Sequence, residues 1–132
     1  MRVFLDTNVL VSAFTTEHGT CASLLRLVLT KYDLVVSEFI ISELKRILTE
    51  RFKTSSVELN NVLSVLYMYE VIPTPLKPYD ISINDNDDKW VLASVIDAKA
   101  DVLITGDQEL LSIGNIGKIK ILSPRGFINL TF

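Results

Sequence analysis

The sequence predicts an α/β domain with a central, mainly parallel β-sheet. Short β-branched runs alternate along the chain with longer segments of helical periodicity, the order expected when helices connect parallel strands. The short runs are apolar at nearly every position, as in strands that are covered on both faces. With 132 residues and no linker or internal repeat, we expect a single domain over residues 1–132.

Five short apolar runs are predicted to form strands because β-branched residues dominate them. They cover residues 3–6, 34–37, 71–74, 102–105 and 119–122. Apolar residues recur with helical spacing over residues 22–31, 38–51, 56–69 and 87–100. Near the end of the chain, Ser123 can cap a short helix whose first residue is Pro124.

Composition excludes several classes of protein. The chain is 48% hydrophobic and 22% charged, and no apolar run reaches the roughly 18 residues of a membrane span. The first residues lack the pattern of a secretory signal peptide, so we expect a cytoplasmic protein that does not enter the membrane. The net charge of −3 disfavours a broad basic surface for nucleic acid, although a local basic patch is compatible with it.

The chain holds one cysteine, Cys21, and one histidine, His18. An intrachain disulfide and a zinc site built from several cysteines or histidines are therefore excluded. A nucleophilic Cys21 activated by His18 is an alternative, but this spacing within a turn is more often incidental. A metal ion bound by this chain would need oxygen ligands.

Three acidic residues stand where such ligands are expected. Asp6 ends one predicted strand and Asp107 follows another, and parallel sheets bind ligands at the carboxyl ends of their strands. Each could instead be an N-cap that accepts backbone hydrogen bonds at the start of a helix. On a helical wheel, Glu43 falls inside the apolar arc between Phe39 and Ile47, so its carboxylate faces the core or a cleft. The alternative for Glu43 is a structural salt bridge.

The acidic segment NDNDDKW, residues 84–90, supplies a fourth candidate. Asp88 lies three residues before Val91, on the buried face of the predicted helix, and we expect it to point inward. Asp87 is rotated by about 100° and is expected to cap the helix or to face solvent. Asp85 lies one turn earlier, so either Asp85 or Asp87 could support Asp88.

These four acids, Asp6, Glu43, Asp88 and Asp107, are predicted to face one cleft. Two carboxylates about 4 Å apart repel by roughly 4 kcal/mol at an effective dielectric near 20, so the cluster needs protons or cations. Mg²⁺ or Mn²⁺ suits oxygen ligands and keeps bound waters, which phosphodiester hydrolysis uses. An EF-hand calcium loop is excluded because its sixth position would be Trp90 instead of glycine.

With these residues in view, the chain resembles the PIN domain family, especially the stand-alone VapC-like toxins of prokaryotic toxin–antitoxin pairs. The matching segments begin at residues 4, 37, 85 and 108 and read FLDTNVLVSAF, SEFIISELKRIL, DNDDKWVLASVIDAKADVLITGD and QELL. They occur in family order and cover most of the chain. The resemblance implies a three-layer sandwich around a parallel sheet and a metal-dependent endoribonuclease that cuts single-stranded RNA.

The resemblance also implies a role for each candidate. The catalytic acids would be Asp6, Glu43, Asp88 and Asp107. Asp6, Asp88 and Asp107 would hold Mg²⁺ or Mn²⁺, while Glu43 would be a further ligand or would orient the attacking water as a base. Asn8 and Thr105 would support the acids by hydrogen bonds. Which of Asp85, Asp87 and Asp88 is the main ligand stays open.

The resemblance further implies partners. RNA phosphates would meet basic side chains at the rim of the cleft, the candidates being Lys45, Arg46, Arg51 and Lys53. The alternative for these residues is an ordinary solvated helix face. Family members pair with an antitoxin and commonly dimerise, and residues 56–69 could supply a homodimer interface, with core packing as the alternative.

Two other functions are compatible with the sequence. An RNA-processing nuclease outside a toxin–antitoxin pair would use the same acids. A non-catalytic, Mg²⁺-binding regulatory or interaction module would resemble receiver domains, in which a strand-end aspartate is phosphorylated. Those domains expect a lysine after a late strand, where this chain has Thr105 and Gly106.

Overall fold

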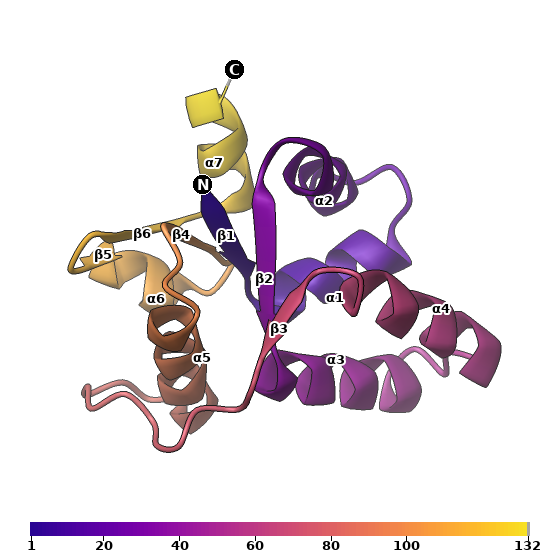
Figure 1. Cartoon of the computed structure of the whole chain (residues 1–132), viewed down its shortest axis with the longest axis horizontal. Helices are drawn as coiled ribbons and strands as arrows, with labels where there is room; N and C mark the ends of the chain where they lie inside the picture. Colours follow the sequence, from indigo (N-terminus) through magenta and orange to yellow (C-terminus); the bar gives the residue numbers. More distant parts are fainter. Residues whose placement is uncertain (132) are drawn as a thin grey trace.

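A six-stranded sheet forms the centre of the computed structural model, which describes residues 1–131 (Figure 1). The strands are β1 (Arg2–Leu5), β2 (Asp33–Ser37), β3 (Glu70–Ile72), β4 (Val102–Ile104), β5 (Asn115–Ile116) and β6 (Ile119–Leu122). Their order in the sheet is β3-β2-β1-β4-β6-β5, and only the β5–β6 pair is antiparallel. The predicted mainly parallel α/β sheet is therefore confirmed.

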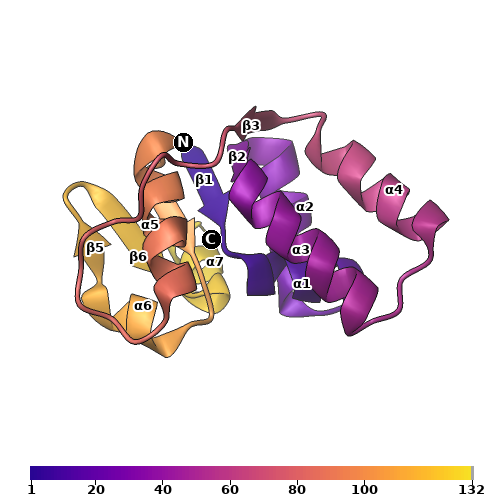
Figure 2. The ribbon, with the colours of Figure 1, turned by 90° about the horizontal axis from the view of Figure 1, so that it is seen from below.

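Helices connect the strands and cover the sheet, which gives the expected layered arrangement (Figures 1 and 2). Within residues 1–131 they are α1 (Thr7–Thr15), α2 (Thr20–Lys31), α3 (Glu38–Glu50), α4 (Ser56–Leu66), α5 (Asn86–Asp97), α6 (Gln108–Ile113) and α7 (Pro124–Thr131). Helix α7 begins as predicted, with the Ser123 hydroxyl accepting a hydrogen bond from the backbone N–H of Gly126 at 2.9 Å. None of these helices is long and apolar enough to cross a bilayer.

The sequence did not predict α1, α6 or β5. The apolar run Val9–Val11 in α1 carries β-branched residues and shows little helical spacing, while α6 and β5 are too short to show a period. The prediction that β1 extends to Asp6 is wrong, because the strand ends at Leu5 and Asp6 is the N-cap of α1. Strand β3 ends at Ile72, directly before Pro73, which lacks the N–H that a strand needs.

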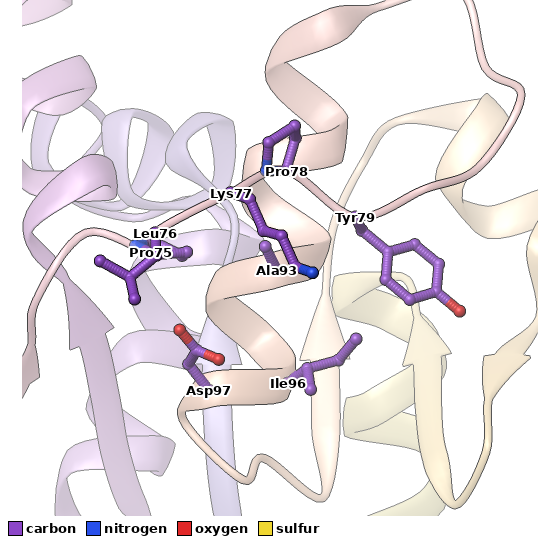
Figure 3. Close-up of a pocket in the computed structure, with 8 residues that line it drawn as sticks. All are labelled: Pro75, Leu76, Lys77, Pro78, Tyr79, Ala93, Ile96 and Asp97. Carbon is purple, nitrogen blue, oxygen red and sulfur yellow. The ribbon is translucent and has the colours of Figure 1, made fainter.

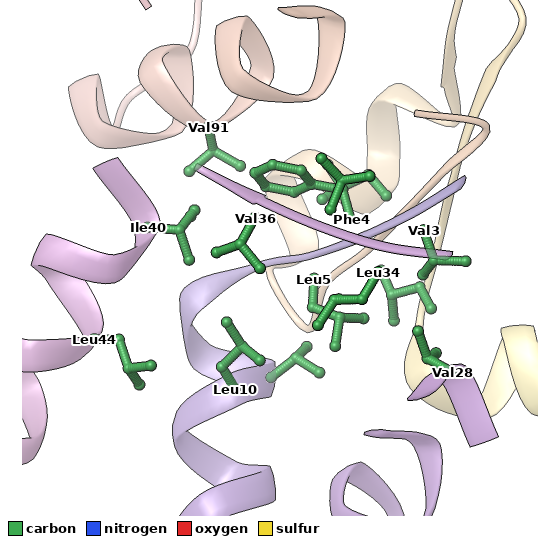
Figure 4. Close-up of a cluster of buried hydrophobic side chains, with 14 of the residues drawn as sticks. Val3, Phe4, Leu5, Leu10, Val28, Leu34, Val36, Ile40, Leu44 and Val91 are labelled. Carbon is green, nitrogen blue, oxygen red and sulfur yellow. The ribbon is translucent and has the colours of Figure 1, made fainter. Parts of the chain in front are cut away.

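The core lies between the sheet and the helices. In Figure 4, Phe4 of β1 and Val36 of β2 lie near Val91 of α5, with Ile40 of α3 on the other side of Val36. Each of these side chains is at most 2% exposed. Val3, Phe4 and Leu5 of β1 are buried consecutively, so both faces of the strand are covered, which explains this apolar run.

Strand register brings the candidate acids to one edge of the sheet. Leu5 pairs with Ile104, and Ile104 pairs with Leu122, so β1, β4 and β6 end side by side. The residue that follows each strand continues this alignment, since the Asp6 N–H donates to the Ile104 carbonyl at 2.9 Å. Helices α1, α3 and α6 begin close to this edge, which places their N-terminal residues together.

Replacing Leu103 by alanine is expected to lower the free energy of unfolding by about 2–5 kcal/mol, because this side chain of β4 is 0% exposed. Leu76→Ala is the matched control. Leu76 is 101% exposed, and its truncation should change the free energy by less than about 0.5 kcal/mol. Chemical denaturation of both variants measures the difference, and equal effects would contradict the burial of β4.

Candidate active site

Six acidic side chains line one pocket of about 140 Å³ at the carboxyl edge of the sheet. They are Asp6, Glu43, Asp85, Asp87, Asp88 and Asp107. Asp6 and Asp107 precede α1 and α6, Glu43 comes from α3, and the other three stand at the start of α5. The fold therefore gathers acids that are up to 101 residues apart in the sequence (6 to 107).

Asp6 is the most constrained of these acids. It is 5% exposed, and its two carboxylate oxygens accept hydrogen bonds from the Thr7 N–H at 2.8 Å and from the Thr105 hydroxyl at 2.6 Å. Burial raises the pKa of Asp6, the two hydrogen bonds lower it, and repulsion from Asp107 and Asp85 raises it further. The ionised form of such a group needs donors or a positive charge nearby, and without them the carboxyl tends to take up a proton.

Thr105 connects two of the acids. Its hydroxyl donates to Asp6 and accepts a hydrogen bond from the Asp107 N–H at 3.0 Å. Asp107 in turn accepts from the Leu110 N–H at 3.0 Å, so it caps α6 as Asp6 caps α1. Capping and pocket lining, which the sequence presented as alternatives for Asp6 and Asp107, therefore occur together.

Glu43 points into the pocket and is held by Thr7, a residue that sequence reasoning missed. The Thr7 hydroxyl, which is buried, donates to Glu43 Oε1 at 2.8 Å. Among residues 1–131, the ion pairs are Arg2–Glu70 and Arg46–Glu50, so the salt-bridge alternative for Glu43 is not observed. The position of Thr7, next to Asp6 in the DTN segment, was the available signal.

The pKa of Glu43 reflects its position between solvent and core. Burial raises it, the Thr7 hydrogen bond lowers it, and the neighbouring charges of Asp87 and Asp6 raise it again. The positive charge of Arg46 lowers the pKa of Glu43. The net direction is upward, which keeps Glu43 a better proton acceptor than a solvated glutamate.

Asp88 gives the clearest indication that the pocket suits a cation. It is 6% exposed, and its Oδ2 atom is buried without a hydrogen-bond partner in the described structure. Burial, followed by repulsion from Asp107, Asp85 and Asp6, raises the pKa of Asp88 to about 7. A buried carboxylate oxygen without a donor is unfavourable by itself, so the site is suited to a cation.

The other two aspartates of the acidic segment differ from expectation in part. Asp85 is the residue that caps α5, accepting from the Asp87 N–H at 2.9 Å. Asp87 was expected either to cap the helix or to face solvent. It is exposed and does not cap the helix. It nevertheless lines the pocket and raises the pKa of Glu43, because α3 and α5 pack against each other at this point.

The remaining predicted residues lie at the periphery. Asn8 lines the pocket with an exposed side chain and, within residues 1–131, makes no hydrogen bond to the acids. The four basic candidates are all exposed on α3 or just after it, outside the set that lines the pocket: Lys45, Arg46, Arg51 and Lys53. Arg46 forms an ion pair with Glu50 at 3.4 Å.

The donor set fits a hard divalent cation. Every polar ligand is an oxygen, Asp88 offers an unpartnered buried oxygen, and the pKa values of Asp6, Glu43 and Asp88 are all raised by mutual repulsion and burial. In the conformation seen for residues 1–131, no three acidic, histidine or cysteine side chains already enclose an ion site. A bound ion would therefore take waters as further ligands or draw the carboxylates closer together.

Asp88→Asn is expected to reduce the pH dependence of stability in the metal-free protein. The folded pKa of about 7 exceeds the ordinary 3.8, so the contribution of Asp88 to stability is fully present below about pH 4 and is lost as the pH rises toward 7. The asparagine variant should lose part of this fall and melt at a higher temperature above pH 7. Melting curves in EDTA measure this, with exposed Asp97→Asn on the same helix as control; an unchanged pH profile would contradict it.

Comparison with known proteins extends these observations. A PIN domain family model matches residues 2–109, which include all six acids. A protein of Methanocaldococcus jannaschii, described as uncharacterized protein MJ1680, is 24% identical over 141 residues, covering 97% of this chain and 90% of its own length.

Two solved structures share the fold. VapBC2 from Rickettsia felis, bound to a DNA fragment from its promoter, matches with a TM-score of 0.66 and 19% identity over 93% of this chain and 98% of that one. Mycobacterium tuberculosis VapC20, described as a sarcin–ricin loop cleaving toxin, matches with a TM-score of 0.63 and 13% identity over 89% and 98%. The family match spans most of the chain and the fold agrees, so the chain belongs to the PIN domain family.

Proposed function

We propose that this PIN-type nuclease is a divalent-metal-dependent endoribonuclease that hydrolyses phosphodiester bonds in single-stranded RNA. The observation that carries the proposal is the buried, unpartnered Oδ2 of Asp88 in a pocket lined by five further acids. Such an arrangement is unfavourable for a protein that binds no cation. The solved neighbours named for VapC toxins support RNA cleavage as the reaction and a toxin–antitoxin pair as its setting.

The carboxylates divide between holding the metal and handling the proton. Asp6, Asp88 and Asp107 would hold Mg²⁺ or Mn²⁺. The bound ion would stabilise negative charge on the phosphate and lower the pKa of water. Glu43 keeps Oε1 on the Thr7 hydroxyl, while Oε2 has no hydrogen bond within residues 1–131 and is available to accept a proton from the attacking water.

Hydrogen bonds fix the acids before substrate arrives. Thr105 holds Asp6 through its hydroxyl and Asp107 through the backbone N–H, so these two carboxylates keep one spacing. Preorganisation of this kind, in which the catalytic groups are oriented before the substrate binds, is a principal source of rate acceleration in polar active sites.

The negative pocket repels RNA, so its approach needs positive charge nearby. The candidates on the exposed side of α3 are Lys45, Arg46, Arg51 and Lys53, and each phosphate contact would make binding sensitive to salt. As a toxin, the protein would work in the cytoplasm, bind an antitoxin and form a homodimer. An RNA-processing nuclease without an antitoxin would use the same pocket.

Asp6→Asn and Asp107→Asn are each expected to reduce RNA cleavage by about 100-fold or more, because each removes a charged metal ligand. Asparagine also caps helices well, so both variants should remain folded. The measurement is cleavage of labelled single-stranded RNA with Mg²⁺, Mn²⁺ or EDTA, with Asp33→Asn, exposed at the start of β2, as the control. Full activity in both variants, or in EDTA, would rule out the proposed mechanism.

Thr7→Val is expected to lower the cleavage rate by roughly 5–10-fold, since it removes one hydrogen bond to Glu43 and nearly preserves the side-chain volume. Loss of that bond should also raise the pKa of Glu43 and shift the acidic limb of the pH–rate profile upward. Thr7→Ser retains the hydroxyl and should restore both properties. Identical profiles for the valine and serine variants would show that Thr7 does not position Glu43.

A further inference from the structure

An aromatic pair lies one helical turn from the acidic pocket. The rings of Phe39 on α3 and Trp90 on α5 have centroids 6.2 Å apart and planes inclined by 32°. Phe39 stands four residues before Glu43, and Trp90 three residues after Asp87, so each ring shares a helix face with a pocket-lining acid. The pair therefore spans the two helices beside the site of proposed chemistry.

Trp90 differs from Phe39 in how it packs. Both rings are half-buried, but only Phe39 belongs to the partly buried side chains that pack against the hydrophobic core in the described structure. Trp90 instead rests on Phe39 and leaves part of a large aromatic surface in contact with solvent. Partly exposed indoles beside polar sites are well suited to bind flat ligands.

A second pocket continues the same face of α5. It has a volume of about 310 Å³ and lies between the segment Pro75–Tyr79 and the second half of α5, where Ala93, Ile96 and Asp97 line it (Figure 3). In Figure 3 the Lys77 side chain extends across this pocket toward the helix. Trp90 stands three residues after Asp87, which lines the acidic pocket, and three residues before Ala93, which lines the second pocket, so one stripe of α5 carries all three.

We propose that the Phe39–Trp90 pair is a stacking site for an unpaired base of single-stranded RNA next to the phosphate that is cut. This inference rests on the proposed function. A strand leaving the acidic pocket along α5 would meet an aromatic surface first and the cation of Lys77 next, which suits a base followed by a phosphate. Stacking on an aromatic side chain tolerates any base, so the site would favour unpaired RNA without reading its sequence.

Trp90 is the single tryptophan of the chain, so its fluorescence reports on this site alone. The Asp6→Asn variant is used so that the RNA is not cleaved. This protein is titrated against a fluorescein-labelled 12-nucleotide RNA of mixed sequence. The fluorescein anisotropy measures binding of the RNA, and a decrease in the Trp90 emission reports stacking of a base on the indole ring. We expect quenching with the same midpoint as the anisotropy change, and less quenching with the duplex of the same sequence.

Variants separate stacking from packing. Trp90→Ala should weaken RNA binding by about 10-fold, while Trp90→Phe, which keeps an aromatic face, should bind within about 3-fold of the parent. Phe52→Ala is the control, because Phe52 is an aromatic side chain 49% exposed just after α3 and outside the pair. Melting temperatures identify any variant that binds RNA weakly because it is destabilised. The fluorescence quenching is measured in protein that keeps Trp90, so it is independent of the stability of these variants.

The outcomes distinguish this inference from the nuclease proposal. RNA binding without a change in indole emission, and with normal affinity in Trp90→Ala, overturns the stacking site; cleavage by the wild-type protein would still support the nuclease. Quenching together with weakened Trp90→Ala binding supports the stacking site even if no cleavage occurs. Absence of RNA binding overturns it.

Discussion

The hydrogen bond from the Thr105 hydroxyl to Asp6, 2.6 Å long and buried, is the interaction on which the site depends. It joins the end of β4 to the end of β1, and through the Asp107 N–H it also sets the start of α6. From Asp6 the chain of contacts continues through Thr7 to Glu43 on α3. The starts of α1 and α6 and the first half of α3 are thus tied to one strand edge by short polar contacts.

These contacts orient charge but do not neutralise it. Asp6 and Glu43 receive hydrogen bonds from neutral groups, and Asp88 keeps a buried oxygen without any partner in residues 1–131. Local stability is therefore lower than a fully paired arrangement would give, and a cation would restore it. Strain of this kind is typical of functional sites, where the surrounding core maintains an unfavourable arrangement.

The same side chains serve the fold and the proposed chemistry. Asp6, Asp85 and Asp107 each cap a helix, so each lies where a helix N-terminus favours negative charge. The parallel sheet places the starts of α1 and α6 along one edge, and the segment of residues 73–85 brings the start of α5 to the same edge. Three of the six acids that face the pocket are therefore also helix caps.

The sequence by itself determined the parallel α/β class, the five longer strands and the burial of Asp88. Continuous apolar runs and helical spacing depend only on residues that are close together in the sequence, so they can be recognised without the tertiary structure. It also indicated that Glu43 faces inward. Only the tertiary structure decided that α1 and α6 are helices, that Asp85 is the cap and that Thr7 binds Glu43 across 36 residues. The sequence likewise did not predict that Phe39 lies close to Trp90, because this contact depends on how α3 packs against α5 and not on any spacing within one element.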